Sequence, residues 1–228
     1  MHYRNVLLAI SVLAAFASCT KNTDNYNPPD AGIHGAVVDA ITGDSLQSEQ
    51  PNGFRIRLID EGYQDATPID FWGMADGSFE NSKVFSGTYK VVPIEGAFFP
   101  ADTQEVAIKG MVEVQFKVTP FLTITASAAA EEGQIVTKYR ISRDSVGDKI
   151  TVCKSLVSTH PTISNSIFDK AVTHDLTGTD DNEILATEFT DTLPGLEGGK
   201  TYYVRIAAAT NNALNKYNYS RIIKITLP

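Results

Sequence analysis

Apolar and polar side chains alternate along most of the chain that follows residue 31. The alternation is clearest in residues 54–58, 112–118, 138–142 and 223–227, where every second residue is apolar and its neighbours are polar or charged. Successive side chains of a strand point to opposite faces of a sheet. This period of two therefore predicts strands with one buried face and one solvated face.

Turn-forming residues separate these runs. They are Thr42-Gly43-Asp44, Pro51-Asn52-Gly53, Asp76-Gly77, Glu95-Gly96 and Gly198-Gly199. Short strands separated by turns at such spacing are typical of β-sandwiches. No segment has the capped apolar stripe of a helix of three or more turns, although Ala126–Glu132 could form a helical turn or two. We therefore predict an all-β protein of two tandem β-sandwich domains that meet near Pro120.

The N-terminus has a different pattern. Residues 1–5 include one basic side chain, Arg4, and residues 6–17 form the apolar run VLLAISVLAAFA. A membrane-spanning helix needs about 20 predominantly apolar residues, so this run is too short to be one. A basic start, a short apolar stretch and small residues after it are typical of a secretory signal peptide. We predict that residues 1–18 are removed on export.

Cys19 follows the apolar run directly, in the sequence Phe16-Ala-Ser-Cys19. This motif resembles a bacterial lipobox, in which the chain is cut before a cysteine that is then acylated, with Phe16 in place of the usual Leu. We predict lipidation at Cys19; the alternative is an ordinary secretory signal followed by an incidental cysteine. Residues 19–31 are polar and contain a Pro pair, which predicts a disordered tether that could hold a folded body up to ~40 Å from the membrane.

Residues 32–119 resemble the carboxypeptidase-regulatory-like, or transthyretin-like, β-sandwich. The resemblance rests on two motifs, GAVVDAITGDSL at 35–46 and DGSFENSKVFSGTYKV at 76–91. The first is a strand followed by a turn, and the second is a hairpin whose inward residues would be Phe79, Tyr89 and Val91. The resemblance implies a fold and no activity, because such domains serve mostly as stalks, spacers and docking surfaces.

Residues 120–228 resemble a fibronectin type III domain, most clearly near the C-terminus. Leu196–Tyr202 has the spacing of the turn that leads into the tyrosine corner of that family, with Gly198 where Pro is usual. Side chains of the strand that follows should alternate between core and solvent. The inward residues are predicted to be Tyr202, Val204 and Ile206, and the outward residues Tyr203 and Arg205.

Together these features resemble a family of Bacteroidetes lipoproteins of unknown function whose genes lie beside SusC/SusD-type glycan-uptake pairs. The lipobox, the first sandwich, the junction Val118–Phe121 and the fibronectin-like domain cover essentially the whole chain. The resemblance implies a lipid-anchored outer-membrane accessory of polysaccharide uptake, at the cell surface or on the periplasmic face. Its implied partners are a polysaccharide and a SusC/SusD-like transporter. No catalytic residue is transferred, because the family has no defined active site.

Composition and charge disfavour several classes of function. Lys and Arg total 19 against 27 Asp and Glu, which gives a formal net charge of −8. Nucleic acids and anionic membranes select basic surfaces, so neither is an expected partner of the folded body. Two cysteines cannot build a disulfide-rich scaffold or a multi-Cys zinc site. Cys153 is expected to be a buried thiol once Cys19 is lipidated.

The sequence also lacks the motifs of an enzyme. It contains no HExxH, no G-x-S-x-G and no phosphate-binding glycine loop, and His34, His160 and His174 are expected to be ordinary surface or strand residues. A glycosidase needs two carboxylates ~5–10 Å apart across a cleft, whereas the paired acids at 60–61, 131–132 and 180–181 fit solvated turns. Asp180–Glu183 is the best calcium candidate, without the spacing of an EF-hand loop. We predict no catalytic residue, no metal site and no cofactor.

Carbohydrate binding is the sharper functional hypothesis. Sugars stack on exposed aromatic faces and are fixed by a few polar groups, so aromatic residues without a role in the core are candidates. They are Tyr63 and Trp72, near Asp65 and Asp70, Phe99 in a connecting loop, and Tyr217 and Tyr219, which flank Asn218 in the last loop of the second domain. The alternative is a structural or docking subunit of a transporter complex with no glycan site of its own. A hydrolase is a third hypothesis, and it would require paired acids across a cleft.

Overall fold

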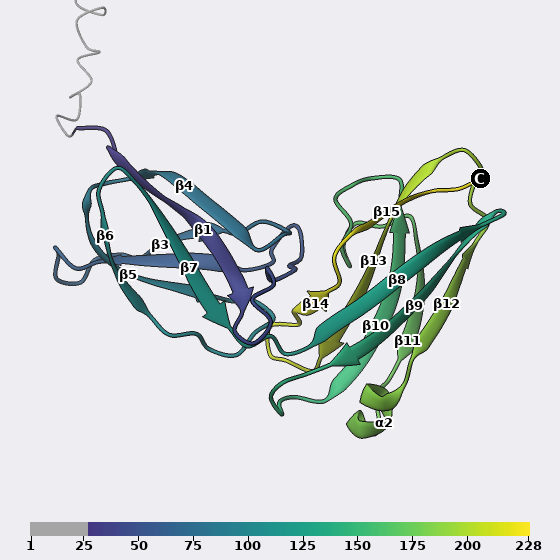
Figure 1. The fold of residues 1–228 in the computed structure, drawn as a ribbon. Coiled ribbons are helices and arrows are strands. Elements are labelled where there is room, and N and C mark those ends of the chain that lie inside the picture. The colour runs from purple at the N-terminus through teal and green to yellow at the C-terminus, as the bar shows by residue number, and fades with distance from the viewer. Residues whose placement is uncertain (1–26) are drawn as a thin grey trace, which may run out of the picture.

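The computed structural model describes residues 27–228 (Figure 1). Strands make up nearly all of its regular structure, and the helix in this part of the chain, α2, spans only Asp181–Ala186. The predicted all-β fold is therefore confirmed. Within residues 27–228, no helix has the length and apolar character needed to span a membrane. The predicted signal peptide, residues 1–18, and Cys19 lie outside the described residues.

The strands form two lobes, which lie side by side in Figure 1. Among the described strands, those before Pro120 pair only with one another, and so do those after it. An isolated bridge between Phe98 and Pro120 lies where the two lobes meet.

Two sheets form the first lobe. One has the order β4-β1-β7, with β1 (Ala31–Asp39), β4 (Ser78–Val84) and β7 (Met111–Val118). The other has the order β3-β2-β5-β6, with β2 (Arg55–Asp60), β3 (Ile69–Trp72), β5 (Gly87–Ile94) and β6 (Gln104–Ile108). β1 starts one residue inside the predicted tether, because Asp30 is fixed at that point by hydrogen bonds from the Ser86 N (2.9 Å) and Oγ (3.0 Å).

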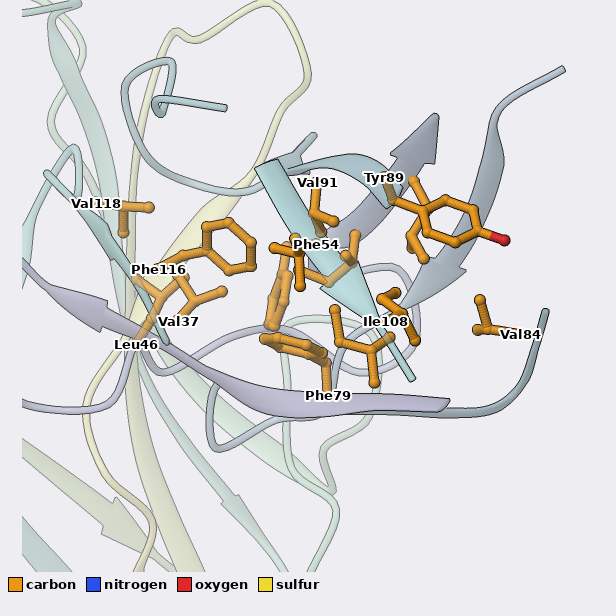
Figure 2. Close-up of a cluster of buried hydrophobic side chains, with 14 of the residues drawn as sticks. Val37, Leu46, Phe54, Phe79, Val84, Tyr89, Val91, Ile108, Phe116 and Val118 are labelled. Atoms are coloured by element: carbon orange, nitrogen blue, oxygen red, sulfur yellow. The ribbon is translucent and has the colours of Figure 1, made fainter. Parts of the chain in front are cut away.

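Apolar side chains of both sheets fill the first lobe (Figure 2). Phe79 and Phe116 lie together with ring centroids 6.0 Å apart, and Phe54 is buried in the same cluster. The inward directions predicted for Phe79, Tyr89 and Val91 are confirmed. The alternation is confirmed too, since the buried residues of 54–58 are Phe54, Ile56 and Leu58.

Two further sheets form the second lobe. One has the order β12-β9-β8, with β8 (Thr123–Glu131), β9 (Gln134–Ser142) and β12 (Phe189–Pro194). The other contains β11-β10-β13-β14, with β15 also paired to β13. Its strands are β10 (Ile150–Ser158), β11 (Lys170–Asp175), β13 (Thr201–Thr210), β14 (Tyr217–Tyr219) and β15 (Ile223–Thr226).

Two sequence predictions for the second lobe have clear outcomes. The Tyr202 Oη accepts a hydrogen bond from the Glu197 N at 2.9 Å, so the tyrosine corner is confirmed. The helical turn considered for Ala126–Glu132 is wrong, because this segment continues β8 and pairs with β9 as far as Glu131. Alanine favours helices in isolation, and here the cross-strand pairing overrides that preference.

Hydrogen bonds fix the chain on both sides of Pro120, where the two lobes meet. The Phe99 N donates to the Thr119 O at 2.9 Å, and the Phe121 N donates to the Ala97 O at 3.1 Å. The buried Asn218 donates from Nδ2 to the Ala97 O at 2.8 Å and accepts from the Leu122 N at 3.0 Å. A side chain that satisfies the backbone of both lobes fixes their relative position.

Arg205 lies at the same junction, and the prediction that it faces solvent is wrong. Its side chain leaves the core face of β13 but is 0% exposed. The loop between β10 and β11 and the first lobe cover it, since Arg205 donates to the Ile163 O at 3.0 Å and the Ala75 O at 3.2 Å. Burial lowers the pKa of Arg205 to about 10, so the guanidinium still carries its charge at neutral pH.

Candidate functional site

Trp72 is the last residue of β3, at the edge of the first lobe that faces the second lobe. Trp72 is 47% exposed, whereas its neighbour Phe71 turns inward to the core and packs against Phe79. Gly73 follows, and a Cβ there would lie 2.0 Å from the ring of Phe54. The backbone is therefore held tightly against the core just after Trp72, which gives the indole a rigid base.

Charged side chains on strands β2 and β3 and just after β5 surround the indole. Arg55 is paired in register with Trp72, and its guanidinium carbon lies 5.4 Å from the ring centroid. The Arg55 Nε also donates to the Glu95 Oε2 at 2.8 Å. Arg57 holds Asp70 through two hydrogen bonds of 2.8 and 2.7 Å, and these lower the pKa of the Asp70 carboxyl. The Asp70 and Glu95 carboxylates are thus fixed as hydrogen-bond acceptors beside an aromatic ring.

The second lobe contributes Lys216 to the same place. Its ammonium lies 5.7 Å from the Trp72 ring centroid and donates a hydrogen bond to the Asn52 O at 2.5 Å. Asn212 positions the loop that carries Lys216, because its amide accepts from the Lys216 N at 2.9 Å and donates to the Lys216 O at 2.9 Å. We call Trp72, Arg55, Asp70, Glu95 and Lys216 the Trp72 platform.

The loop that contains Tyr63 does not join this platform. Tyr63 is 74% exposed, but it follows β2 at the end opposite to Arg55. The β2–β3 register runs from Arg55–Trp72 to Leu58–Ile69, so Tyr63 and Asp65 lie beyond the far end of the hairpin. Of the two acids predicted near Trp72, the structure places Asp70 there and Asp65 elsewhere.

Phe99 and Tyr217 are only partly exposed. The Phe99 ring packs edge-on against Phe121 with centroids 5.1 Å apart, and a Cβ on Gly147 would lie 2.8 Å from it. Phe99 therefore packs between the two lobes. Tyr217 is half-buried with the Lys154 ammonium 5.4 Å from its ring centroid, and burial raises its pKa.

Tyr219 cannot be an exposed platform, so that prediction is wrong. It is 5% exposed, the Arg205 guanidinium lies 4.4 Å from its ring centroid, and its Oη accepts from the Asn165 N at 3.0 Å. The expected loop around Asn218 is the strand β14, which pairs with β13. Tyr219 is buried because this strand brings it under the loop that also covers Arg205.

The acidic segment Asp180–Glu183 is used by the fold. The Asp180 carboxylate accepts from the Asn182 N at 2.9 Å and caps helix α2. Asp181 is 5% exposed and accepts from the Arg143 Nη2 at 2.7 Å, so the view of this pair as solvated is wrong for Asp181. Within the described residues, no group of three or more His, Cys, Asp or Glu side chains converges on a point that could hold a metal.

A second set of chemically capable side chains lies inside the second lobe. The Asp191 carboxylate is 4% exposed and accepts from the Ser155 Oγ at 2.6 Å and the Tyr139 Oη at 3.1 Å. His174 Nε2 lies 2.6 Å from the other Asp191 oxygen, and Tyr139 also contacts the Cys153 Sγ at 3.2 Å. Burial raises the pKa of the Cys153 thiol to about 11, so the thiol is protonated and unreactive at neutral pH. The cluster lies between two sheets, where it serves the core.

Sequence reasoning missed Arg55, Glu95 and Lys216 as members of the platform. Arg55 was correctly expected to be outward, but its contact with Trp72 depends on the β2–β3 register. Lys216 comes from the other lobe, and no local pattern predicts that contact. The signal that could have been used is the sole Trp at the end of a strand opposite a row of outward arginines on β2.

The chain is similar to a protein family of unknown function and to several solved structures. Residues 31–119 match the family model described as "Protein of unknown function (DUF3823) N-terminal domain". No curated protein matches the chain. A DUF3823 family protein from Bacteroides uniformis superposes with a TM-score of 0.77 at 25% identity, over 88% of this chain and 100% of that one. A DUF3823 family protein from Parabacteroides merdae superposes with a TM-score of 0.75 at 18% identity, over 88% of this chain and 100% of that one.

A further structure from Bacteroides uniformis is described as a "putative carbohydrate binding protein". It superposes with a TM-score of 0.74 at 21% identity, over 87% of this chain and 100% of that one. The two-lobe fold is thus shared along essentially the full length of these structures. The predicted resemblance to a family of unknown function is confirmed to that extent, and the predicted link to SusC/SusD transporters stays a prediction.

Proposed function

We propose that this protein is a non-catalytic, lipid-anchored outer-membrane protein that binds polysaccharide at the Trp72 platform. The observation that carries the proposal is an exposed indole on a rigid strand end, ringed by charged groups that both lobes hold in place. A similar structure from Bacteroides uniformis is described as a "putative carbohydrate binding protein", and this description supports the same class of ligand.

The platform has the two components that recognition of a sugar ring requires. The apolar face of the indole offers area to the C–H groups of a pyranose, and the fixed Asp70 and Glu95 carboxylates accept hydrogen bonds from its hydroxyls. Lys216 contacts both the ring and the Asn52 O, so a ligand that covers the same part of the indole has to displace a contact worth about 0.5–1 kcal/mol and one hydrogen bond. Because Arg55 and Arg57 already hold the carboxylates, little ordering remains for binding to complete.

Trp72→Ala is expected to weaken binding of a retained polysaccharide by about 10- to 100-fold. Aromatic stacking platforms lose about 1–3 kcal/mol on alanine substitution in the well-measured case of nucleobases, and 1.4 kcal/mol is tenfold. Affinity electrophoresis of the folded protein through gels that contain a panel of polysaccharides measures the effect as lost retardation.

The matched controls are Tyr63→Ala and Phe168→Ala, which remove exposed aromatic rings outside the platform. Both should migrate like the unaltered chain in every gel. Retardation that survives Trp72→Ala but is lost in Tyr63→Ala would move the site to the β2–β3 loop. Absence of retardation on every polysaccharide would overturn the proposal.

Cys19→Ala is expected to abolish labelling by radioactive palmitate and to release the protein from the membrane fraction. Acyl chains contribute ~0.8 kcal/mol per buried methylene, so two or three chains hold a soluble body stably at the membrane. A chain without acyl groups lacks this anchor. Ser18→Ala, a substitution next to the acylated residue, serves as the control and should label normally. A Cys19→Ala chain that still incorporates palmitate would refute the lipid anchor.

A second candidate function is that of a docking subunit beside a SusC/SusD-like transporter. The observation that favours it is a set of exposed apolar side chains near the start of β1, where the tether reaches the fold. Phe85 follows Val84, the partner of Ala31, and is 48% exposed; Met111, the partner of Gly32, is 52% exposed. Exposed apolar groups of this kind mark protein contact surfaces when they gather. Recovery of transporter subunits by crosslinking in intact membranes distinguishes this function from glycan binding alone.

A further inference from the structure

A groove of about 440 Å³ opens between the two lobes, beside the Trp72 platform. The first lobe lines it with Ile94, Phe98 and Ala101, and the second lobe lines it with Phe121, Ala213 and Leu214. Leu214 is 53% exposed, so one apolar wall is open to solvent. Two acids, Glu95 and Asp148, are the charged residues of its lining.

The walls of this groove are preformed. Phe98 is 6% exposed, and its ring lies 1.9 Å from where a Cβ on Gly96 would be, so the loop before it is packed without slack. On the other side Asn212 fixes the loop with Ala213 and Leu214 through hydrogen bonds of 2.9 Å to the Lys216 N and O. A ligand would therefore meet a shaped apolar surface rather than create one.

The groove is continuous with the Trp72 platform. Glu95 lines the groove and also accepts from the Arg55 Nε at 2.8 Å, while the Arg55 guanidinium lies 5.4 Å from the Trp72 centroid. Arg55 is paired in register with Trp72 on one side and Ile94 on the other. Two strand spacings, about 10 Å, therefore separate Trp72 from the groove residue Ile94, a distance that a short oligosaccharide spans.

We propose that this groove is a second subsite for the same glycan and that it takes a neutral sugar unit with an apolar substituent, such as an O-acetyl group or the methyl group of a deoxy sugar. The proposal rests on the proposed function. Apolar walls favour burial of a methyl group, and Glu95 and Asp148 offer acceptors to hydroxyls, while the lining within residues 27–228 holds no cation to pair with a uronate or a sulfate. The groove thus selects substituted neutral glycans over bare or acidic ones.

The experiment uses oligosaccharides of acetylated xylan and acetylated glucomannan, each compared with the same material after alkaline deacetylation. Methyl NMR signals of Ala213 and Leu214 report on the groove, and the Trp72 indole signal reports on the platform. We expect the groove methyl signals to move with acetylated probes alone and affinity for these probes to be about tenfold higher. Ala213→Trp, which fills the groove, should remove the preference, and Ala129→Trp, on the exposed face of β8, should keep it.

The outcomes separate the two proposals. Indole movement with equal affinity for both forms of a probe, or a preference that survives Ala213→Trp, overturns the groove subsite and leaves the platform in place. Absence of indole movement with every probe overturns the proposed function. Groove methyl signals that shift with protein concentration in the absence of glycan would overturn the subsite in favour of a contact between copies of the chain.

Discussion

Arg205→Ala is expected to lower the free energy of unfolding by about 3 kcal/mol. The fully buried guanidinium donates to the Ser220 O at 3.0 Å, the Ile163 O at 3.0 Å and the Ala75 O at 3.2 Å. Truncation leaves these carbonyl groups without that donor and opens a cavity against the Tyr219 ring. The gain from no longer burying a charge offsets part of the cost, so the expected loss stays below the sum of the separate penalties.

The same substitution should also uncouple the two lobes. Trp72 is the only Trp of the chain and lies in the first lobe, so its fluorescence reports on that lobe, while far-ultraviolet circular dichroism reports on both. In urea the unaltered protein is expected to give coincident transitions by the two probes. Arg205→Ala should separate them, because one of the bonds it removes joins β13 to Ala75 of the first lobe.

Two further variants serve as comparisons for Arg205→Ala. Arg205→Met keeps most of the volume and removes the donors, so it isolates the hydrogen-bond contribution. Arg221→Ala removes an ion pair to Asp44 that also joins the lobes but is 72% and 66% exposed, and it should cost less than about 1 kcal/mol. Equal unfolding midpoints for Arg205→Ala and Arg221→Ala would contradict a structural role of the buried arginine.

Arg205 also shows where prediction from the sequence stops. The period of two correctly predicted the strands of 54–58, 112–118 and 138–142, because one face of each packs on a single core. In β13 the second face is covered as well, by the loop between β10 and β11 and by the first lobe. Alternation indicates which residues leave the core, and it carries no information on what covers the other face.

A signal for this double coverage was present in the sequence. Arg205 is followed by the buried Ile206 and then by three consecutive alanines, residues 207–209, which are all buried. A run without polar interruption is typical of a strand that is packed on both faces. The same coverage explains Tyr219, whose place next to Arg205 follows from the pairing of β14 with β13.

The sequence predicted an exposed aromatic ring with an acid beside it, but it predicted only some of the residues of the site. An exposed Trp72 with Asp70 nearby followed from the local sequence, because residues two apart on a strand share a face. The contact with Lys216 and the groove required the packing of two lobes, which depends on positions far apart in the chain. Tyr63 remained exposed but apart from Trp72, because the hairpin carries it to the opposite end of β2 and β3.

Asp191→Ala is expected to destabilise the second lobe by about 3 kcal/mol. The carboxylate is buried and accepts from the Ser155 Oγ at 2.6 Å, the Tyr139 Oη at 3.1 Å and the His174 Nε2 at 2.6 Å. His174 can turn to water, since its side chain is 36% exposed. Tyr139 and Ser155 are fully enclosed between the sheets, so each loses a partner that water does not replace.

Asp191→Asn should recover part of this loss, because the Ser155 Oγ and the Tyr139 Oη share one carboxylate oxygen, whose place the amide oxygen takes, while the amide nitrogen faces His174. Glu188→Ala serves as the surface control: its ion pair with Arg140 is 52% and 55% exposed and is worth less than about 1 kcal/mol. Urea unfolding is followed by near-ultraviolet circular dichroism, to which the second lobe contributes Tyr139, Tyr202 and Tyr219, and by Trp72 fluorescence, which reports on the first lobe. If Asp191→Ala were more stable than Asp191→Asn, the stabilising role of this network would be contradicted. Burial of the acceptor would then cost more free energy than its three contacts contribute.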